Sequence, residues 1–202
     1  MSDPIVVTDP ITEAVSLAEV KLQCRIDDST SDSLLEIFRV AARKHVEWRT
    51  GRTLHQTTLK TILYQWPIGN AITLPRATPL ITIDSAVYKD SGGTEHTWSA
   101  DEYVADTDAS PGKLVLAYGA SWPSFTPYPV SPITIQYTCG IQTTSPITEV
   151  CSALKYPILL LIGAMWENRE EVVVSDRGMV SQLAVKCGAE SYITQAITSY
   201  VF

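Results

Sequence analysis

The run from Tyr156 to Trp166 is apolar on every side of a helix, and it places the strongest constraint on how this chain can fold. A helix without a polar face has to be covered all round by other parts of the protein. The run is too short to cross a bilayer and contains Pro157 and Gly163, so we interpret it as a buried helix. A chain of 202 residues can only just enclose such a helix, and we therefore expect neighbouring subunits to supply part of the cover.

Helices are predicted in four places from capping residues and helical spacing. Ser16 and Glu19 have the spacing of a capping box, which opens a short helix. The four helices are expected to cover residues 16–25, 32–50, 145–169 and 190–202. The predicted buried stripe of the second helix comprises Leu34, Leu35, Phe38, Ala41, Ala42, His45 and Trp48, flanked by a weaker apolar edge at Ile37, Val40 and Val46.

Between residues 53 and 138 the apolar period changes to two, which is typical of half-buried antiparallel strands. Glycines within residues 89–94 predict a hairpin turn, and further short strands are expected near residues 102–105 and 113–118. Residues 118–132 contain four prolines and are predicted to form a long irregular loop. The predicted apolar face of the strands comprises Ile62, Tyr64, Trp66, Ile81, Ile83, Ile133, Ile135 and Tyr137.

These patterns predict an α+β fold in which N- and C-terminal helices form a helical bundle with an inserted antiparallel β region. Residues 1–14 are expected to be an extended N-terminal arm. Residues 15–52 and 145–171 would form the helical core, and residues 53–140 the β insertion. Residues 172–202 are predicted to be a linker followed by a C-terminal amphipathic helix.

The charge and cysteine content exclude several classes of protein. The net charge of −7 argues against a protein that grips nucleic acid through its phosphates, because such binding needs a basic face. The acidic charge does not exclude a protein that DNA slides past, because an acidic wall would repel the DNA backbone. The first residues lack the basic and apolar regions of a secretory signal, so no secretory signal is expected. The four cysteines match no zinc pattern and are predicted to be reduced: Cys24, Cys139, Cys151 and Cys187.

No group of residues in the sequence predicts catalysis. His45 and Glu47 match half of the zinc deaminase signature, but its cysteine half is absent. The tripeptide Gly-Ala-Ser at residues 119–121 lacks the second glycine of a nucleophile elbow. We therefore predict no catalytic residue, no metal and no cofactor.

Four pieces of the sequence, in order, carry a resemblance to a known family. The first piece is VSLAEVK at residues 15–21 with RIDD at 25–28, and the second is AARKHVE at 41–47 with TGR at 50–52. The third piece, in the β region, is LPR at 74–76, PL at 79–80 and YGASWP at 118–123. The fourth is MWENRE at 165–170. In this pattern the chain resembles the head–tail connector (adaptor) proteins of long-tailed bacteriophages. The resemblance ends after Val172, where the chain is longer than the family pattern.

The resemblance implies a structural protein of the virion neck, made in the bacterial cytoplasm, without catalytic residues and without a membrane segment. It implies a homo-oligomeric ring, commonly of twelve copies, between the portal protein and the next neck or tail-completion protein. DNA would pass through the ring without specific binding. The alternative hypothesis, from a different class, is a small protein-binding module that uses the β region and the Pro-rich loop at residues 123–132.

Candidate interface residues follow from these hypotheses. Each of them also has an ordinary explanation, as part of a solvated charged face, a surface ion pair or core packing. Aromatic side chains are frequent anchors of protein interfaces, and arginines pair with acidic partners. The predicted subunit or portal interface residues are Arg43, Arg49, Arg52, Trp166, Glu167, Arg169, Tyr192, Ile197, Tyr200 and Phe202.

Overall fold

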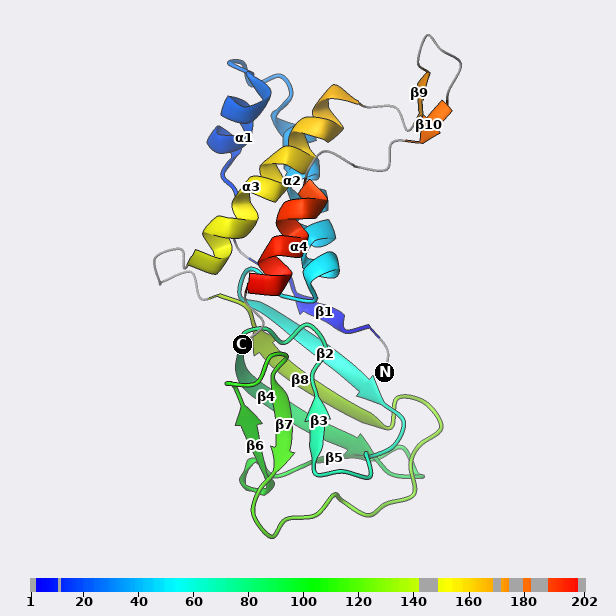
Figure 1. The fold of residues 1–202 in the computed structure, drawn as a ribbon. Coiled ribbons are helices and arrows are strands. Elements are labelled where there is room, and N and C mark those ends of the chain that lie inside the picture. The colour runs from blue at the N-terminus through cyan, green and yellow to red at the C-terminus, as the bar shows by residue number, and fades with distance from the viewer. Residues whose placement is uncertain are drawn as a thin grey trace. The chain divides into compact units, whose positions relative to one another are not determined.

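The computed structural model describes residues 3–10, 12–141, 149–168, 172–174, 180–182 and 189–199. The chain divides into two compact units, and each is described by itself. The β unit comprises residues 1–11 and 51–143, and the helical unit comprises residues 12–50 and 144–202 (Figure 1). The predicted α+β class with antiparallel sheets is confirmed.

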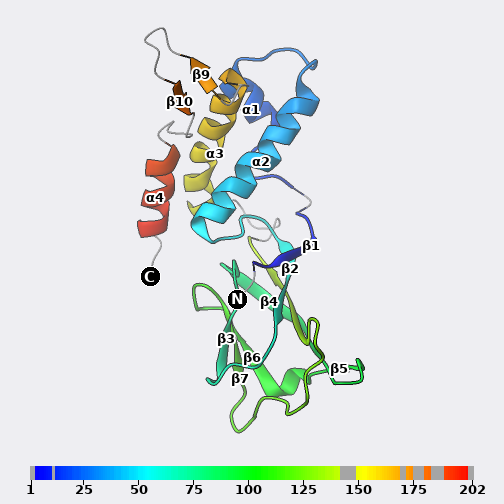
Figure 2. The ribbon, with the colours of Figure 1, turned by 90° about the vertical axis from the view of Figure 1, so that its right-hand side faces the viewer.

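The helical unit is organised around the apolar helix that the sequence singled out. Helices α1, α2 and α4 each contact α3, and all four are visible in Figures 1 and 2. Their bounds are Leu17–Cys24 for α1, Asp32–Thr50 for α2, Glu149–Glu167 for α3 and Ala189–Ser199 for α4. The fully buried side chains include Val20, Leu35, Ala42, Val46, Leu154, Ile158, Leu161, Ile162 and Ile193.

Helix α1 begins as the sequence predicts. The Ser16 hydroxyl accepts from the Glu19 amide at 3.2 Å, and the Glu19 carboxylate accepts from the Ser16 amide at 2.7 Å, which completes the capping box. Arg25 ends the helix in the left-handed region at φ 56°. Lys155 of α3 donates to Glu19 at 2.7 Å, so one carboxylate both caps α1 and ties it to α3.

The predicted stripe of α2 is partly wrong. Leu35 and Ala42 are fully buried as expected, but Trp48 is 68% exposed, and Val46 is fully buried in its place. At about 100° per residue, Leu35, Ala42 and Val46 lie on one line of the helix, whereas Trp48 lies on the far side. The buried face is completed by Arg43 and Glu47, which a hydrophobic pattern does not count.

The β unit contains two antiparallel sheets. The larger has the strand order β1-β2-β8-β4-β5, and the smaller has the order β3-β7-β6. The strands are β1 (Ile5–Thr8), β2 (Thr57–Leu63), β3 (Ala71–Thr73), β4 (Leu80–Lys89), β5 (Glu95–Thr97), β6 (Tyr103–Asp106), β7 (Lys113–Leu116) and β8 (Ile133–Cys139). The hairpin turn at residues 89–94 is confirmed between β4 and β5, and the predicted N-terminal arm contains an edge strand, β1.

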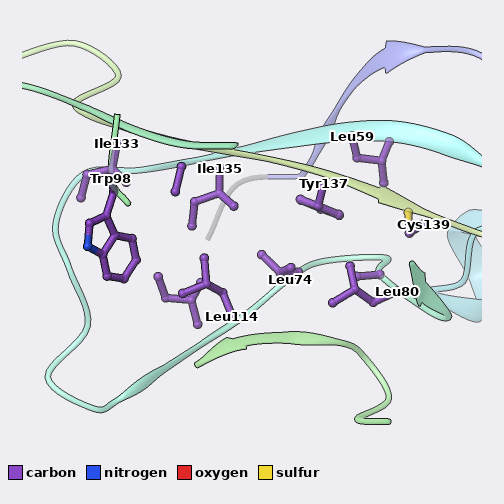
Figure 3. Packing of buried hydrophobic residues seen from close by; sticks show 12 residues of the cluster. Leu59, Leu74, Leu80, Trp98, Leu114, Ile133, Ile135, Tyr137 and Cys139 are labelled. Atoms are coloured by element: carbon purple, nitrogen blue, oxygen red, sulfur yellow. The ribbon is translucent and has the colours of Figure 1, made fainter. Parts of the chain in front are cut away.

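The core of the β unit lies between its two sheets. As predicted, Ile133, Ile135 and Tyr137 of β8 are all fully buried. Figure 3 shows Ile135 pointing toward Leu74 and Leu114 from the opposite side of the core. The Tyr137 hydroxyl donates to the backbone carbonyl of residue 75 at 2.6 Å, and burial raises the pKa of this phenol.

The predicted phase of β2 is wrong. Thr57, Leu59 and Thr61 face the core, while Ile62 is half-buried and Tyr64 is 68% exposed beyond the end of the strand. The cause is the register with β8, in which the buried positions of β8 lie directly opposite the odd-numbered positions of β2. Residues on one face of a sheet share its environment, so the partner strand decides which face of β2 is inward.

One glycine is required by the close approach of two backbone segments. Gly140 follows β8 with φ +100°, a conformation that side chains rarely adopt. A Cβ at this position would lie 2.1 Å from the backbone oxygen of His55, so no other residue fits without movement of the chain. His55 forms an isolated bridge with Ile141 at the same point.

The region after α3 contains a short two-stranded sheet. Within residues 172–202, for which a linker followed by a helix is predicted, Val172–Val174 form β9, which pairs with β10 at Val180–Gln182. This two-stranded sheet is separate from the other two. The predicted helix start at Ser145 and Pro146 lies outside the described residues.

Candidate assembly surfaces

Arg43 lies at the centre of a buried ionic group in the helical unit. Its side chain is 4% exposed. Its Nε donates to Glu13 at 2.7 Å and its Nη1 donates to Glu47, itself 2% exposed, at 3.0 Å. Within one chain, the charge of Arg43 thus holds the segment before α1 against α2, and its predicted role at a subunit or portal interface stays a prediction.

Arg49 lies on a surface shared by α2 and α4. It donates to Glu190 at 2.7 Å, and His45 lies 3.6 Å from the other oxygen of the same carboxylate. Arg49 holds the pKa of Glu190 below its usual range, with a smaller contribution from His45. The guanidinium also lies 6.0 Å from the ring centroid of Trp48. We call His45, Trp48, Arg49 and Glu190 the α2–α4 surface.

Tyr192 adds an aromatic contact between α4 and α3. Its ring meets the ring of Tyr156 edge-on, with centroids 5.0 Å apart and planes at 90°. The two side chains are 44% and 48% exposed, so both keep a large free area. Ile197 lies in α4, where only its backbone is described, and Arg169, Tyr200 and Phe202 lie outside the described residues.

Trp166 and Glu167 line a groove of about 500 Å³ between the C-terminal ends of α1 and α3. Trp166 is half-buried and Glu167 is exposed. Burial raises the pKa of the Cys24 thiol in this groove, and the charge of Glu167 adds to the effect. The remaining lining residues are Gln23, Arg25, Leu160, Gly163, Ala164 and Asn168.

The Pro-rich loop of the β unit is held by aromatic packing. Trp122 stacks on Trp66 with centroids 5.0 Å apart, and Phe125 packs against both Trp66 and Tyr88. Trp98 contacts Trp66 and Trp122 from the core side. These contacts pack Trp122 and Phe125, at the start of the loop, against the core of the β unit. Arg52, the remaining predicted interface residue, is half-buried in the β unit.

Two loops present fully exposed apolar side chains at one place in the β unit. Ile68 and Tyr118 are as exposed as they would be in an isolated peptide. The Leu116 amide donates to Asn70 at 2.9 Å, and the Trp122 indole donates to Gly69 at 2.7 Å, so the two loops are bound side by side. We call Ile68 and Tyr118 the β-unit tip. Sequence reasoning missed it, although an isoleucine placed between a proline and a glycine was a usable signal.

The described part of the chain carries no arrangement that indicates chemistry. Within it, no cluster of three or more histidine, cysteine, aspartate or glutamate residues could hold a metal ion. None of the helices in the described ranges is both long and apolar enough to span a membrane. What these surfaces offer is apolar and aromatic area beside paired charges, which is the composition of a protein interface.

Comparison with protein families gives a match over residues 14–110 to the family described as phage gp6-like head-tail connector protein. The resemblance predicted from the sequence is confirmed by this match. The family is a structural connector and not an enzyme. No curated protein matches the chain.

Solved structures share the fold over nearly the whole chain. The neck of an empty gene transfer agent (GTA) particle, computed with C6 symmetry, aligns with a TM-score of 0.74 at 22% identity over 96% of this chain and 95% of the other. A chain of the native GTA virion gives 0.72 at 22% over 95% and 93%. The neck of the native particle, computed with C12 symmetry, gives 0.69 at 22% over 96% and 94%.

Proposed function

We propose that this chain is a structural connector of a phage-type neck. Twelve copies form a ring between the portal protein and the next neck component, and DNA passes through the ring. The observation that carries the proposal is the family match over residues 14–110, together with a fold shared with neck structures over 96% of the chain. The protein would be made in the host cytoplasm and reside in the virion.

The exposed aromatic residues support assembly into a ring. A closed ring needs two different, complementary surfaces on each copy. The helical unit offers the α2–α4 surface, the Tyr156–Tyr192 pair and the groove beside Trp166, and the β unit offers its tip. Large aromatic side chains that lose their solvent contact on association are the usual energetic centres of such interfaces.

The acidic charge of the chain supports a passive channel. With a net charge of −7, a ring of these copies would repel the phosphate backbone. We expect the purified protein to show no salt-dependent affinity for double-stranded DNA, because that affinity depends on displaced counterions at basic side chains. DNA would then be threaded and released without being held.

The portal protein encoded in the same genome is the partner with which to test the proposal. The two proteins are mixed, and the mass of the particles is measured by mass photometry. We expect a gain equal to twelve copies per portal, and a lower occupancy for Trp48→Ala. Because Trp48 is 68% exposed, this variant should keep its fold. No gain in mass, under conditions in which particles assemble, contradicts the proposal.

A protein-binding module is the second candidate, and the β-unit tip is the observation that favours it. Ile68→Ser and Tyr118→Ser remove the apolar tip without touching the packed aromatic residues beneath it. If these variants lose every partner of the wild-type chain while Trp48→Ala keeps them all, the module explains the data better than the ring does.

A further inference from the structure

Among the residues that the structure describes, strand β1 is an open edge of the five-stranded sheet. It pairs with β2 on one side and is the first strand in the sheet order (Figure 1). All four of its residues are exposed, with Ile5 at 47%, Val6 at 39% and Val7 at 46%. An edge strand presents unpaired backbone donors and acceptors, and β-branched residues favour the pairing of a further strand.

Strand β1 contains no charged residue and no proline, and the irregularity in its pairing with β2 is a register shift between Val6 and Thr8. Edge strands are usually guarded by charged residues or proline within the strand. Pro4 and Pro10 flank β1 but do not interrupt it. At the opposite edge of the same sheet, β5 contains Glu95 and His96, and polar, chargeable side chains within the strand make it a poorer template.

The helical unit contains a small sheet that could accept a further strand. Strands β9 and β10 pair with each other in an antiparallel sheet of two strands. Two paired strands are marginally stable in water, and a third strand is generally needed for independent stability. The backbone of β9, with the sequence Val-Val-Val, is suited to extend a sheet on its other side.

We propose that β9 of one copy pairs with β1 of the neighbouring copy. The β9–β10 sheet then extends the five-stranded sheet across the subunit boundary, and the added strands pair with the backbone groups at the open edge of β1. This contact joins two different surfaces of the same chain, so it repeats head to tail and can close into a ring. The inference deepens the proposed connector function and rests on it for the identity of the partner as a second copy.

Photo-crosslinking in the full chain tests the pairing. The photoreactive residue p-benzoylphenylalanine replaces Val7, and in a matched control it replaces Val104, which is 58% exposed in β6, an edge strand of the smaller sheet. Equal amounts of ¹⁵N-labelled and unlabelled protein are mixed at high concentration, so that mass spectrometry separates links between copies from links within one copy. We expect a link from position 7 to residues 172–174 of a second copy, and no such link from position 104. The absence of a link between copies, or one that maps to another segment, overturns the inference.

A second measurement uses substitutions that the isolated fold should tolerate. Val7→Lys places a charge on the open edge, and Val104→Lys places the same charge on a strand outside the proposed contact. We expect Val7→Lys to weaken association of the copies by about tenfold or more and Val104→Lys to leave it unchanged. Far-UV circular dichroism checks that both variants fold. An equal effect of the two substitutions counts against the pairing.

The two proposals fail in different ways. Rings that form on the portal equally well with Val7→Lys, and show no protection of the amides of residues 5–8 from hydrogen exchange, would leave the connector function standing and remove the strand pairing. A crosslink from position 7 to β9 without any ring on the portal would leave the pairing standing and remove the connector function.

Discussion

Replacing Arg43 by methionine should destabilise the helical unit far more than replacing any exposed arginine. Arg43 is 4% exposed and lies between two carboxylates, those of Glu13 at 15% exposure and Glu47 at 2%. Methionine keeps the aliphatic volume but removes the cation. Breaking a buried ion pair by removing one partner costs about 3–5 kcal/mol, because the remaining charge is left poorly solvated.

This cost is measurable by thermal or urea unfolding followed by circular dichroism at a helical wavelength. The helical unit has roughly 100 residues. A loss of about 3 kcal/mol would lower the Tm of a domain of this size by about 12–24 °C. The matched control is Arg49→Met on the same helix, whose side chain is 43% exposed and pairs with Glu190 at 2.7 Å. That pair should contribute about 1 kcal/mol or less.

A double substitution separates the charge from the packing. Adding Glu47→Gln to Arg43→Met removes one unpaired charge, so we expect the double variant to recover part of the lost stability. If Arg43→Met and Arg49→Met prove equally mild, within about 1 kcal/mol of the wild type, then the buried ionic group does not stabilise the unit and the reasoning is refuted.

Three further predictions follow from single contacts. Lys155 holds the pKa of Glu19 at about 2, so the stability from this pair is present above about pH 4.5 and is lost as the pH falls toward 2. Lys155→Met should reduce this change in the free energy of unfolding by less than about 1 kcal/mol, because Glu19 is partly exposed. Acid titrations of unfolding measure the difference. Gly140→Ala should destabilise the β unit by more than about 2 kcal/mol in urea unfolding. The control Gly119→Ala should cost about 1 kcal/mol, because Gly119 has φ +80° but no described atom within 4 Å of the new Cβ. Similar losses for the two variants would contradict the role of the close backbone contact at Gly140. Tyr137→Phe removes the partly buried hydrogen bond to the carbonyl of residue 75 and should cost about 1 kcal/mol, and an unchanged urea midpoint would show that the hydrogen bond contributes nothing.

Local signals in the sequence predicted the helices well. The bounds of α2 agree with the prediction at both ends, and the capping box at Ser16 forms as expected. The alternation in β8 also identified three residues of the core. In each case the signal lies within a few residues of the feature that it predicts, and the rest of the chain does not override it.

Features that depend on distant residues could not be predicted from the local sequence pattern. Trp48 was predicted to be buried because the pattern ignored Arg43 and Glu47, which occupy the inner face of α2 as an ion pair. The inward face of β2 is set by β8, more than 70 positions further along the chain, as in the pairing of Leu59 with Tyr137. Neither effect can be derived from a local hydrophobic period.

For the candidate surfaces too, local sequence signals identify residue types, whereas exposure depends on distant residues. Aromatic residues could be named as possible anchors from the sequence alone, but their exposure depends on tertiary packing. Trp166 lines a groove together with Cys24, a residue of a different helix, and this neighbour cannot be derived from the sequence around Trp166. Ile68 and Tyr118 stand out only because hydrogen bonds fix the two loops that carry them.

Cryo-electron microscopy of this protein bound to its portal tests the central claim most directly. Each copy is expected to leave aromatic area uncovered when alone and to cover it against the next copy. We expect a closed collar of twelve repeating densities under the portal, each containing one helical unit and one β unit, around an open bore. A portal that carries no collar, or single copies attached without contact to one another, would contradict it.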